Sequence, residues 1–348
     1  MTYPSQDLGY ARVPAPIQSA SFDAEKLHWK ATATYFVGCL GTVAGCYAAI
    51  ACSLLFLRAT DHLPPPIVTN NLCFDEKLQW MSRELPSSTP DLLVFGSSVA
   101  WRHFDSEKAI KSELTKNPYN LGFCGIRLSQ TAFVIRYFLD KQIFQFPLRA
   151  VLIASPQDFE GCRGSEEQVF SKPAADEAIF SPAHAWELYF KNLDPVSFVR
   201  NATVVKAMRQ GTMPLDPLIL TKSGDGPLDT AANRPDLVYG EGTGLSQDCF
   251  YALRQIAKQF SDRSIEFVLL LTPINPRWIS EYDPNHGTLK SLRSRIAETL
   301  KGSGAHIWDA SESTLFLETD FVDAIHLRWS AAGRLTAAMT DFAKKSAD

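Results

Sequence analysis

The segment that most restricts the possible fold runs from Asp91 to Phe104 and reads DLLVFGSSVAWRHF. Its first part, through Phe95, is a short apolar run that is typical of a strand in a parallel sheet covered on both faces. The run ends at Gly96-Ser97-Ser98, and a helical pattern begins at about Asp105. Because ligands of open α/β sheets bind just beyond the carboxyl ends of the strands, Ser98 is at a suitable place for a nucleophile. The simpler alternative is that Gly-Ser-Ser is only a turn.

Apolar runs and amphipathic patterns alternate along the rest of the chain. This alternation predicts an α/β domain with a parallel sheet and helices on both of its faces. The expected strands are residues 91–95, 149–154, 265–271 and 306–308, and residues 119–125 are expected to form a short strand that ends in a Gly-rich loop. The expected helices are residues 76–84, 105–116, 128–141, 198–209, 246–260, 288–301 and 330–344.

One segment, Ala31 to Leu57, has no charged residue and is long enough to cross a bilayer of roughly 30 Å. A signal peptide and a buried core helix are the alternatives, and the length of the apolar stretch favours a membrane span over both. Lys26 and Lys30 precede the segment and Arg58 follows it. This slight excess of positive charge predicts a cytoplasmic N-terminus and an extracytoplasmic main domain, periplasmic or on the cell surface.

The predicted organisation has four parts. They are a disordered cytoplasmic tail (1–30), a transmembrane helix (31–57), a linker with a short helix (58–90), and an α/β domain (91–348) with an irregular insertion at 160–245. Leu63-Pro64-Pro65-Pro66 in the linker predicts a stiff, extended spacer. An insertion of this length between sheet elements is usually functional or mobile, and we interpret it as a cap or a substrate-binding excursion.

Composition narrows the choice of ligands. The net charge of −4 does not favour nucleic-acid binding. The histidines and cysteines show no metal-ligand spacing and no cofactor motif is evident, so neither a metal nor a cofactor is expected. Four cysteines lie outside the apolar segment and can pair if that part of the chain is outside the cytoplasm, but their connectivity cannot be read from sequence. They are Cys73, Cys124, Cys162 and Cys249.

Asp323-Ala324-Ile325-His326 precedes the last expected helix and supplies the groups that a serine nucleophile needs. A serine hydroxyl reacts only when a base takes its proton, and His326 is the candidate base. Asp323 can accept a hydrogen bond from the other ring nitrogen and so fix the tautomer. The alternatives are that Asp323 only caps a loop and that His326 is an exposed loop histidine.

Acyl transfer also needs hydrogen-bond donors that are directed at the developing oxyanion. The candidates are the Ser98 amide, the Gly125 amide and the Gln157 side chain. Gly125 can equally be a turn glycine, and Gln157 a surface residue. Asp158, next to Gln157, is interpreted as structural. For His103, packing within the first helical turn is favoured over contact with substrate.

Four blocks of this kind, in this order, resemble the SGNH, or GDSL-like, hydrolase superfamily. They are Val94-Phe95-Gly96-Ser97-Ser98, Asn120-Leu121-Gly122-Phe123-Cys124-Gly125, Ser155-Pro156-Gln157-Asp158 and Asp323-Ala324-Ile325-His326. The resemblance implies a flavodoxin-like three-layer α/β/α sandwich. It also implies Ser98 as nucleophile and oxyanion donor, Gly125 as second donor, and His326 and Asp323 as the rest of the triad. The family's usual Asp before the serine is Ser97 here, and its usual third-block Asn is Gln157.

Three short motifs, Gly-Ser-Ser, Ser-Pro-Gln and Asp-x-Ile-His-Leu-x-Trp, are similar to the membrane-anchored branch of the superfamily that contains the D-alanine transfer protein of lipoteichoic acid assembly. The resemblance implies a serine acyltransferase or esterase that acts on O-acyl groups of an envelope or exported polysaccharide. A multi-span membrane acyltransferase is a possible partner. Two alternatives remain: a non-catalytic domain of the same shape that binds polysaccharide or scaffolds such a partner, and an unrelated α/β domain with coincidental motifs.

Overall fold

A computed structural model describes residues 24–347, except for 70, 86–88, 142–143, 145–147, 182–184 and 235–241. The chain divides into two compact units, Met1–Arg58 and Ala59–Asp348. Of the expected disordered tail, residues 1–23 lie outside the described residues. Residues 24–30 were expected to be disordered but are helical, because α1 already begins at Ala24.

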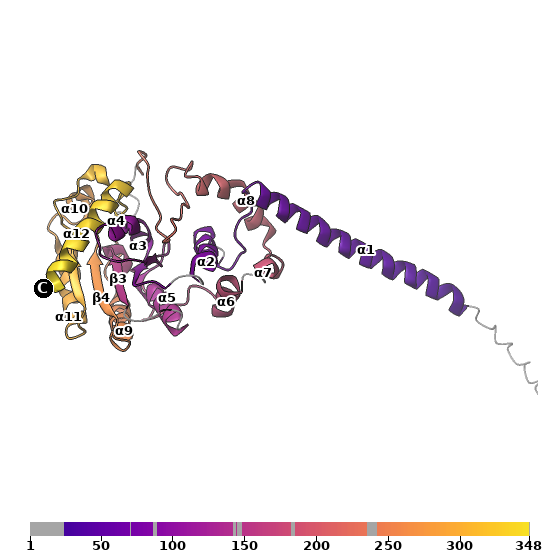
Figure 1. Ribbon diagram of the computed structural model, residues 1–348, viewed down its shortest axis with the longest axis horizontal. Helices are drawn as coiled ribbons and strands as arrows, with labels where there is room; N and C mark the ends of the chain where they lie inside the picture. Colours follow the sequence, from indigo (N-terminus) through magenta and orange to yellow (C-terminus); the bar gives the residue numbers. More distant parts are fainter. Residues whose placement is uncertain are drawn as a thin grey trace, which may run out of the picture. The chain divides into compact units, whose positions relative to one another are not determined.

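The second unit is built on a parallel sheet of five strands (Figure 1), as the α/β prediction requires. The strands are β1 (Leu92–Gly96), β2 (Pro118–Asn120), β3 (Arg149–Ala154), β4 (Glu266–Leu271) and β5 (His306–Asp309), in the order β2-β1-β3-β4-β5. All four neighbouring pairs are parallel. This is the strand order of flavodoxin-like sheets, in which the direction of winding reverses between β1 and β3.

Helices cover both faces of this sheet, and the strands send alternate side chains to each face. Leu93 and Phe95 of β1 pack into a core with helices α2, α5, α9 and α11. Leu92 and Val94 of the same strand pack into a second core with α3, α4, α10 and α12. Because β1 is buried along its whole length, it has no polar alternation in sequence.

The helices include several that the sequence patterns did not predict. Those with a predicted counterpart are α1 (Ala24–Ala59), α2 (Leu72–Glu84), α4 (Ser106–Lys111), α5 (Leu128–Asp140), α8 (Pro195–Arg209), α9 (Gln247–Ser261), α11 (Gly287–Leu300) and α12 (Trp329–Ala347). Those without one are α3 (Ser98–His103), α6 (Lys172–Phe180), α7 (Ala185–Lys191), α10 (Pro276–Tyr282), and the short 3₁₀ helices η2 (Pro156–Phe159) and η4 (Glu318–Asp320).

One prediction after the first strand was wrong in its bounds, and a second describes the structure well. The helix expected over 105–116 ends at Lys111, and α3 precedes it because Ser97 accepts a hydrogen bond from the Val99 amide as an N-cap. Residues 119–125 were expected to form a short strand that ends in a Gly-rich loop, and the strand β2 ends at Asn120. The amides of Leu121 and Phe123 still donate to carbonyls of β1, so the chain continues along that strand as a loop.

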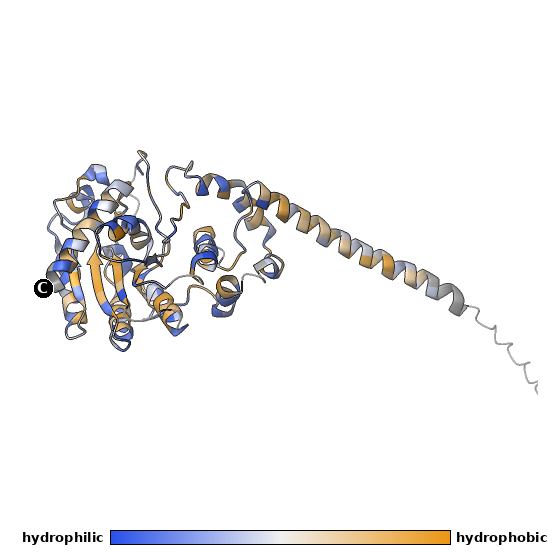
Figure 2. Ribbon diagram, viewed as in Figure 1, coloured by the Kyte–Doolittle hydropathy of each residue, from blue (hydrophilic) through white to orange (hydrophobic). Residues whose placement is uncertain are grey.

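Helix α1 contains a stretch, Ala31–Ala59, that is long and apolar enough to cross a membrane. A signal sequence has the same character, so this composition alone does not separate the two. Figure 2 shows apolar residues along most of this helix and in the central strands. In the strands they are enclosed by the folded unit, whereas in α1 most of them are exposed.

The linker after α1, for which the prolines predicted a stiff and extended spacer, packs against the insertion. Leu63, Pro64, Pro65, Pro66 and Ile67 are buried, because α7 and α8 of the insertion pack against this part of the linker. The Tyr189 hydroxyl donates to the Pro64 carbonyl at 2.6 Å, and the Asn192 amide donates to the Ile67 carbonyl at 2.9 Å. Arg209 of α8 donates to the Leu63 carbonyl at 3.0 Å. The proline-rich linker is therefore held in place by α7 and α8.

The insertion leaves and rejoins the sheet domain at neighbouring points. Glu160 and Leu245 form an isolated antiparallel bridge, and a disulfide joins Cys162 to Cys249. A second disulfide joins Cys73 of α2 to Cys124. The four cysteines outside the apolar segment are thus all paired, whereas Cys39, Cys46 and Cys52 of α1 are free.

Candidate active site

Ser98 is the first residue of α3, directly beyond the carboxyl end of β1. The turn requires glycine at position 96, where φ is +139° and a Cβ would lie 2.2 Å from the Ile153 carbonyl oxygen. This close approach of β1 to β3 is at the point where the winding of the sheet reverses, which is the usual ligand position of such folds. The sequence Gly-Ser-Ser is therefore a tight strand-to-helix turn that presents Ser98.

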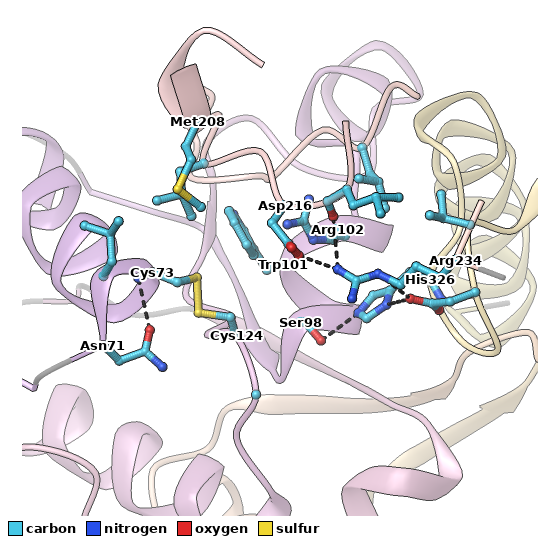
Figure 3. A pocket seen from close by; sticks show the side chains of 17 residues that line it. Asn71, Cys73, Ser98, Trp101, Arg102, Cys124, Met208, Asp216, Arg234 and His326 are labelled. Atoms are coloured by element: carbon cyan, nitrogen blue, oxygen red, sulfur yellow. Dashed lines mark hydrogen bonds and ion pairs between the residues drawn. A yellow bond between two sulfur atoms is a disulfide. The ribbon is translucent and has the colours of Figure 1, made fainter. Parts of the chain in front are cut away.

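The structure brings Ser98, His326 and Asp323 into one hydrogen-bonded chain (Figure 3), as their residue types predicted. His326 Nε2 lies 2.7 Å from Ser98 Oγ, and His326 Nδ1 lies 2.8 Å from Asp323 Oδ2. With the Nδ1 proton donated to the carboxylate, Nε2 is the acceptor for the serine proton. Both distances are within the reach that a nucleophile and its base require.

Hydrogen bonds and the neighbouring His326 keep Asp323 in its ionised form. Burial opposes ionisation, but attraction to His326 and its hydrogen bond outweigh it, together with hydrogen bonds from the Ile325 and His326 amides, so the pKa of Asp323 is lowered. Both of those amides donate to Oδ1, at 2.9 and 2.8 Å, and this leaves Oδ2 directed at the imidazole. Asp323 thus caps its own loop and orients His326 at the same time.

The loop of His326 is held from two sides by groups that reach it from other parts of the sheet. Asn275, after β4, donates its side-chain amide to the Asp323 carbonyl at 3.1 Å and its backbone amide to the Ala324 carbonyl. His103 Nε2 of α3 accepts a hydrogen bond from the Leu327 amide at 2.9 Å. The imidazole of His326 is therefore fixed relative to α3, which carries Ser98.

His103 has no exposed surface, which agrees with the packing role favoured from sequence. Because its Nε2 accepts a hydrogen bond from the Leu327 amide, its own proton is on Nδ1, which is 2.6 Å from Thr272 Oγ1. Burial above all, and the nearby His326, lower the pKa of His103 well below its ordinary value. A neutral His103 supports the loop and does not compete with His326 as a base.

Ser98 and His326 open into a cavity of about 320 Å³. Apart from α3 and the loop of His326, its wall comes from three parts of the chain: the start of α2, the loop around Cys124 and Gly125, and the insertion. Figure 3 shows Met208 and Asp216 of the insertion on the wall opposite the Cys73–Cys124 disulfide. The insertion thus contributes directly to the space in which a ligand of Ser98 would bind.

The three oxyanion candidates do not all line this cavity. Ser98 and Gly125 do, and Gly125 has φ of +67° with open space where a Cβ would lie. Gln157 is half-buried on η2 and is not among the described residues that line the cavity. Asp158 accepts hydrogen bonds from the Ser155 amide and hydroxyl and from the Ser97 side chain, so it is a structural link between the ends of β1 and β3.

Arg234 is the main cavity residue that the sequence patterns missed. Its guanidinium forms an ion pair with Asp216, and its Nε lies 3.8 Å from Asp323 Oδ2. Its backbone amide donates to the Val322 carbonyl at 3.0 Å. Arg234 is in a Pro-, Gly- and Asp-rich stretch without periodicity, and only the folded insertion brings it to Asp323, so no local pattern could have identified it.

Fold and site together define an α/β protein that presents a Ser-His-Asp arrangement in a cavity at the topological switch point of its sheet. No protein-family model and no curated protein matches the sequence. Among solved structures, the chain is similar to Est24, a carbohydrate acetylesterase from Sinorhizobium meliloti, with 13% identity, coverage of 73% of this chain and 98% of that one, and a TM-score of 0.34. It is also similar to an inhibitor-bound aryl esterase of M. smegmatis, with 11% identity, coverage of 73% and 98%, and a TM-score of 0.31. At these TM-scores neither likeness bears on what this chain does.

Proposed function

We propose that the protein is a serine esterase or O-acyltransferase of the SGNH type, anchored to a membrane by α1. The observation that carries this proposal is the Ser98–His326–Asp323 chain, with hydrogen bonds of 2.7 and 2.8 Å, at the wall of an open cavity. The three groups come from opposite ends of the sequence. Nucleophilic acyl chemistry needs these three side chains in contact. If Ser98 were only part of a turn and His326 only a loop histidine, no such contact would be required.

In the proposed reaction, Ser98 Oγ attacks the carbonyl carbon of an O-acyl ester while its proton moves to His326 Nε2. The resulting oxyanion is stabilised by the amides of Ser98 and Gly125. The C–O bond to the leaving alcohol then breaks, and His326 returns the proton to that alcohol. A water molecule or a sugar hydroxyl next gives its proton to His326 and attacks the acyl-Ser98 carbonyl, which releases the acid or the new ester and restores the serine.

The proposed substrate is an acylated glycan of the envelope or an exported polysaccharide. The lining of the cavity supports this class of substrate, because it combines apolar residues and the aromatic Trp101 with the charged groups of Arg234 and Asp216. A mixture of aromatic and hydrogen-bonding side chains suits a ligand with an apolar acyl group and polar hydroxyls. Transfer to a second glycan, rather than hydrolysis, requires that an acceptor hydroxyl occupy the cavity in place of water.

The test of this proposal is the reactivity of Ser98 in the full chain. A fluorophosphonate probe should label the wild-type protein stoichiometrically at Ser98, and Ser98→Ala should lose the label and about 10³-fold or more of its turnover of a chromogenic acetyl ester. Ser280→Ala, which removes an exposed hydroxyl on α10, is the matched control and should retain both. Equal ester turnover in Ser98→Ala and the control would exclude the mechanism.

A non-catalytic polysaccharide-binding or scaffolding role is the alternative. What favours it is the position of Gln157, which replaces the family's usual Asn and does not line the cavity, so one of the three candidate oxyanion donors is missing there. An unlabelled Ser98 together with measurable glycan binding would support this role. Stoichiometric labelling would contradict it, because a binding domain does not need an activated serine.

A further inference from the structure

The junction of α7 and α8 carries a group of exposed apolar side chains that the proposed chemistry does not use. Phe190, Leu193, Val196 and Val199 are 39%, 46%, 79% and 61% exposed, and they recur every third residue. They account for four of the nine large apolar side chains that are exposed in the described part of the unit Ala59–Asp348. Such clustering within ten residues indicates a contact surface rather than scattered apolar residues.

These helices are fixed to the segment that follows α1. Lys206 of α8 donates to the carbonyl of Thr60, the residue directly after the last residue of α1, at 3.1 Å. The hydrogen bonds of Tyr189, Asn192 and Arg209 to the linker carbonyls continue this attachment through Ile67. Arg209 also forms a bidentate ion pair with Glu76 of α2, at 2.7 and 2.8 Å. The α7–α8 junction therefore cannot move away from the point where the chain leaves α1.

The length of the apolar stretch indicates where the end of α1 lies relative to the bilayer. Ala31–Ala59 has 29 residues and would be about 43 Å long as a helix, close to the full thickness of a bilayer with its headgroups. If α1 spans the membrane, Thr60 is at the headgroup surface, and Lys206 of α8 contacts it there. Val199 and Val196 are about two to three helical turns from Lys206 along α8. The charged neighbours of these apolar side chains are balanced, since Lys191 pairs with Glu177 and Glu187 and Arg200 lies near Asp194. The apolar side chains themselves therefore provide the affinity for the interface of a bilayer.

We propose that Phe190, Leu193, Val196 and Val199 form a bilayer-contact patch, which inserts into the headgroup region of the membrane that α1 crosses. The far end of α8 carries Met208, which lines the cavity of Ser98. Since α8 has 15 residues and is about 22 Å long, the patch holds the cavity within a short distance of the lipid surface. A substrate ester would then bind close to the membrane surface. The proposal rests on α1 spanning the membrane, but not on catalysis by Ser98.

The experiment uses the full chain in nanodiscs that contain phosphatidylcholine and phosphatidylglycerol. Cys39, Cys46 and Cys52 are replaced by Ala, so that a single introduced cysteine carries an environment-sensitive NBD group while both disulfides remain. The probe is placed at Val196→Cys, and the matched control is Glu107→Cys on α4, where the side chain is 80% exposed and is not attached to the linker. Emission is recorded with and without lipids that carry a spin label at the headgroup or at a shallow acyl position.

We expect NBD emission at position 196 to shift to shorter wavelength and to be quenched by the spin-labelled lipids at least about twofold more than at position 107, as for a side chain within 5–10 Å of the headgroup boundary. Equal, water-like emission at both positions would overturn the proposal. A blue shift at position 196 without lipid quenching would also overturn it, because a protein partner or a second copy would then cover the patch. Loss of the chain from the discs would show that α1 is not an anchor. NBD emission and lipid quenching do not depend on ester turnover. A failure of the proposed chemistry at Ser98 can therefore be distinguished from a failure of the proposed membrane contact.

Discussion

At the scale of single residues, the two oxygens of Asp323 have different partners, and this difference leads to a prediction. Oδ1 accepts two backbone amides and Oδ2 accepts His326 Nδ1–H. In Asp323→Asn the side-chain oxygen must stay with the two amides, so its NH₂ group faces Nδ1. His326 then carries its proton on Nε2 and donates to Ser98 instead of accepting from it.

We therefore expect Asp323→Asn to fold normally but to lose about 10³- to 10⁴-fold in ester turnover, as expected when a triad histidine is held in the wrong tautomer. Fluorophosphonate labelling of Ser98 should slow in parallel. The control is Asp320→Asn, a nearby carboxylate that pairs with Arg334 and does not contact the imidazole. Turnover in Asp323→Asn within tenfold of the control would mean that Asp323 is only a loop cap.

The residues that carry the proposed chemistry could be read from the sequence because acyl chemistry restricts their types. Ser98 after a buried strand and Asp-x-x-His before the last helix are recognisable without coordinates. Arg234 and Asn275 could not be identified in this way, since each acts through a contact that only the folded chain creates. Gln157 shows the converse: a suitable residue type at a strand end was predicted for the oxyanion hole, yet it does not line the cavity.

At the scale of elements, the start of α2 contains a buried carboxyl that makes stability depend on pH. Asp75 is 3% exposed, and its Oδ1 accepts the Val68 and Thr69 amides and the Thr69 hydroxyl. Burial raises its pKa to about 6, against the lowering effect of these hydrogen bonds. Because the folded pKa is above the unfolded value of 3.8, the folded state binds more protons between about pH 4 and 6, so this contribution to stability is lost as the pH rises through that window.

Asp75→Asn keeps an oxygen at the position of Oδ1 and is never ionised. We expect the free energy of unfolding of this variant, relative to wild type, to increase between pH 4 and pH 7 by up to about 3 kcal/mol. Urea unfolding of the full chain, followed by tryptophan fluorescence at several pH values, measures this difference. Glu107→Gln at an exposed position of α4 is the control. A difference between Asp75→Asn and wild type that stays constant with pH would contradict the assignment.

The elements of the sheet were the most predictable part of the fold. The bounds of β3 agree with the prediction, and those of β1, β4 and β5 differ by one residue, because an enclosed parallel strand must be apolar throughout. Helix α3 was missed because six residues are too short to show a period. Helices α6 and α7 were missed for a related reason. Helix α6 packs on α2 and α7 packs on α6, so their apolar positions follow that packing and no simple amphipathic repeat results.

At the scale of the whole molecule, the insertion has two roles, and its irregular sequence did not indicate which of its segments serves which role. It supplies the wall of the cavity through Met208, Asp216 and Arg234, and it holds the linker that follows α1 through α7 and α8. The disulfide of Cys162 and Cys249 joins residues 87 apart and closes this insertion at its base. In the chain-entropy description, a crosslink over such a loop stabilises the folded state by about 4–5 kcal/mol.

The distribution of paired cysteines predicts the side of the membrane on which the second unit folds. All four cysteines of that unit form disulfides, and the three free ones are in α1. Disulfides of this structural kind persist in oxidising compartments and are rare in the cytosol. This supports the proposed extracytoplasmic position of the cavity, in line with the positive charges of Lys26 and Lys30 before the apolar stretch.

Alkylation of the denatured full chain, isolated from cells with its thiols trapped, tests this orientation by mass spectrometry. Without reduction, three alkyl groups should be added, at Cys39, Cys46 and Cys52, and with prior reduction seven should be added. Addition of seven groups without reduction would place the unit in a reducing compartment, so that α1 would have the reverse orientation. In that case the cavity could not meet an exported polysaccharide, and the proposed substrate would have to be replaced by a cytoplasmic ester.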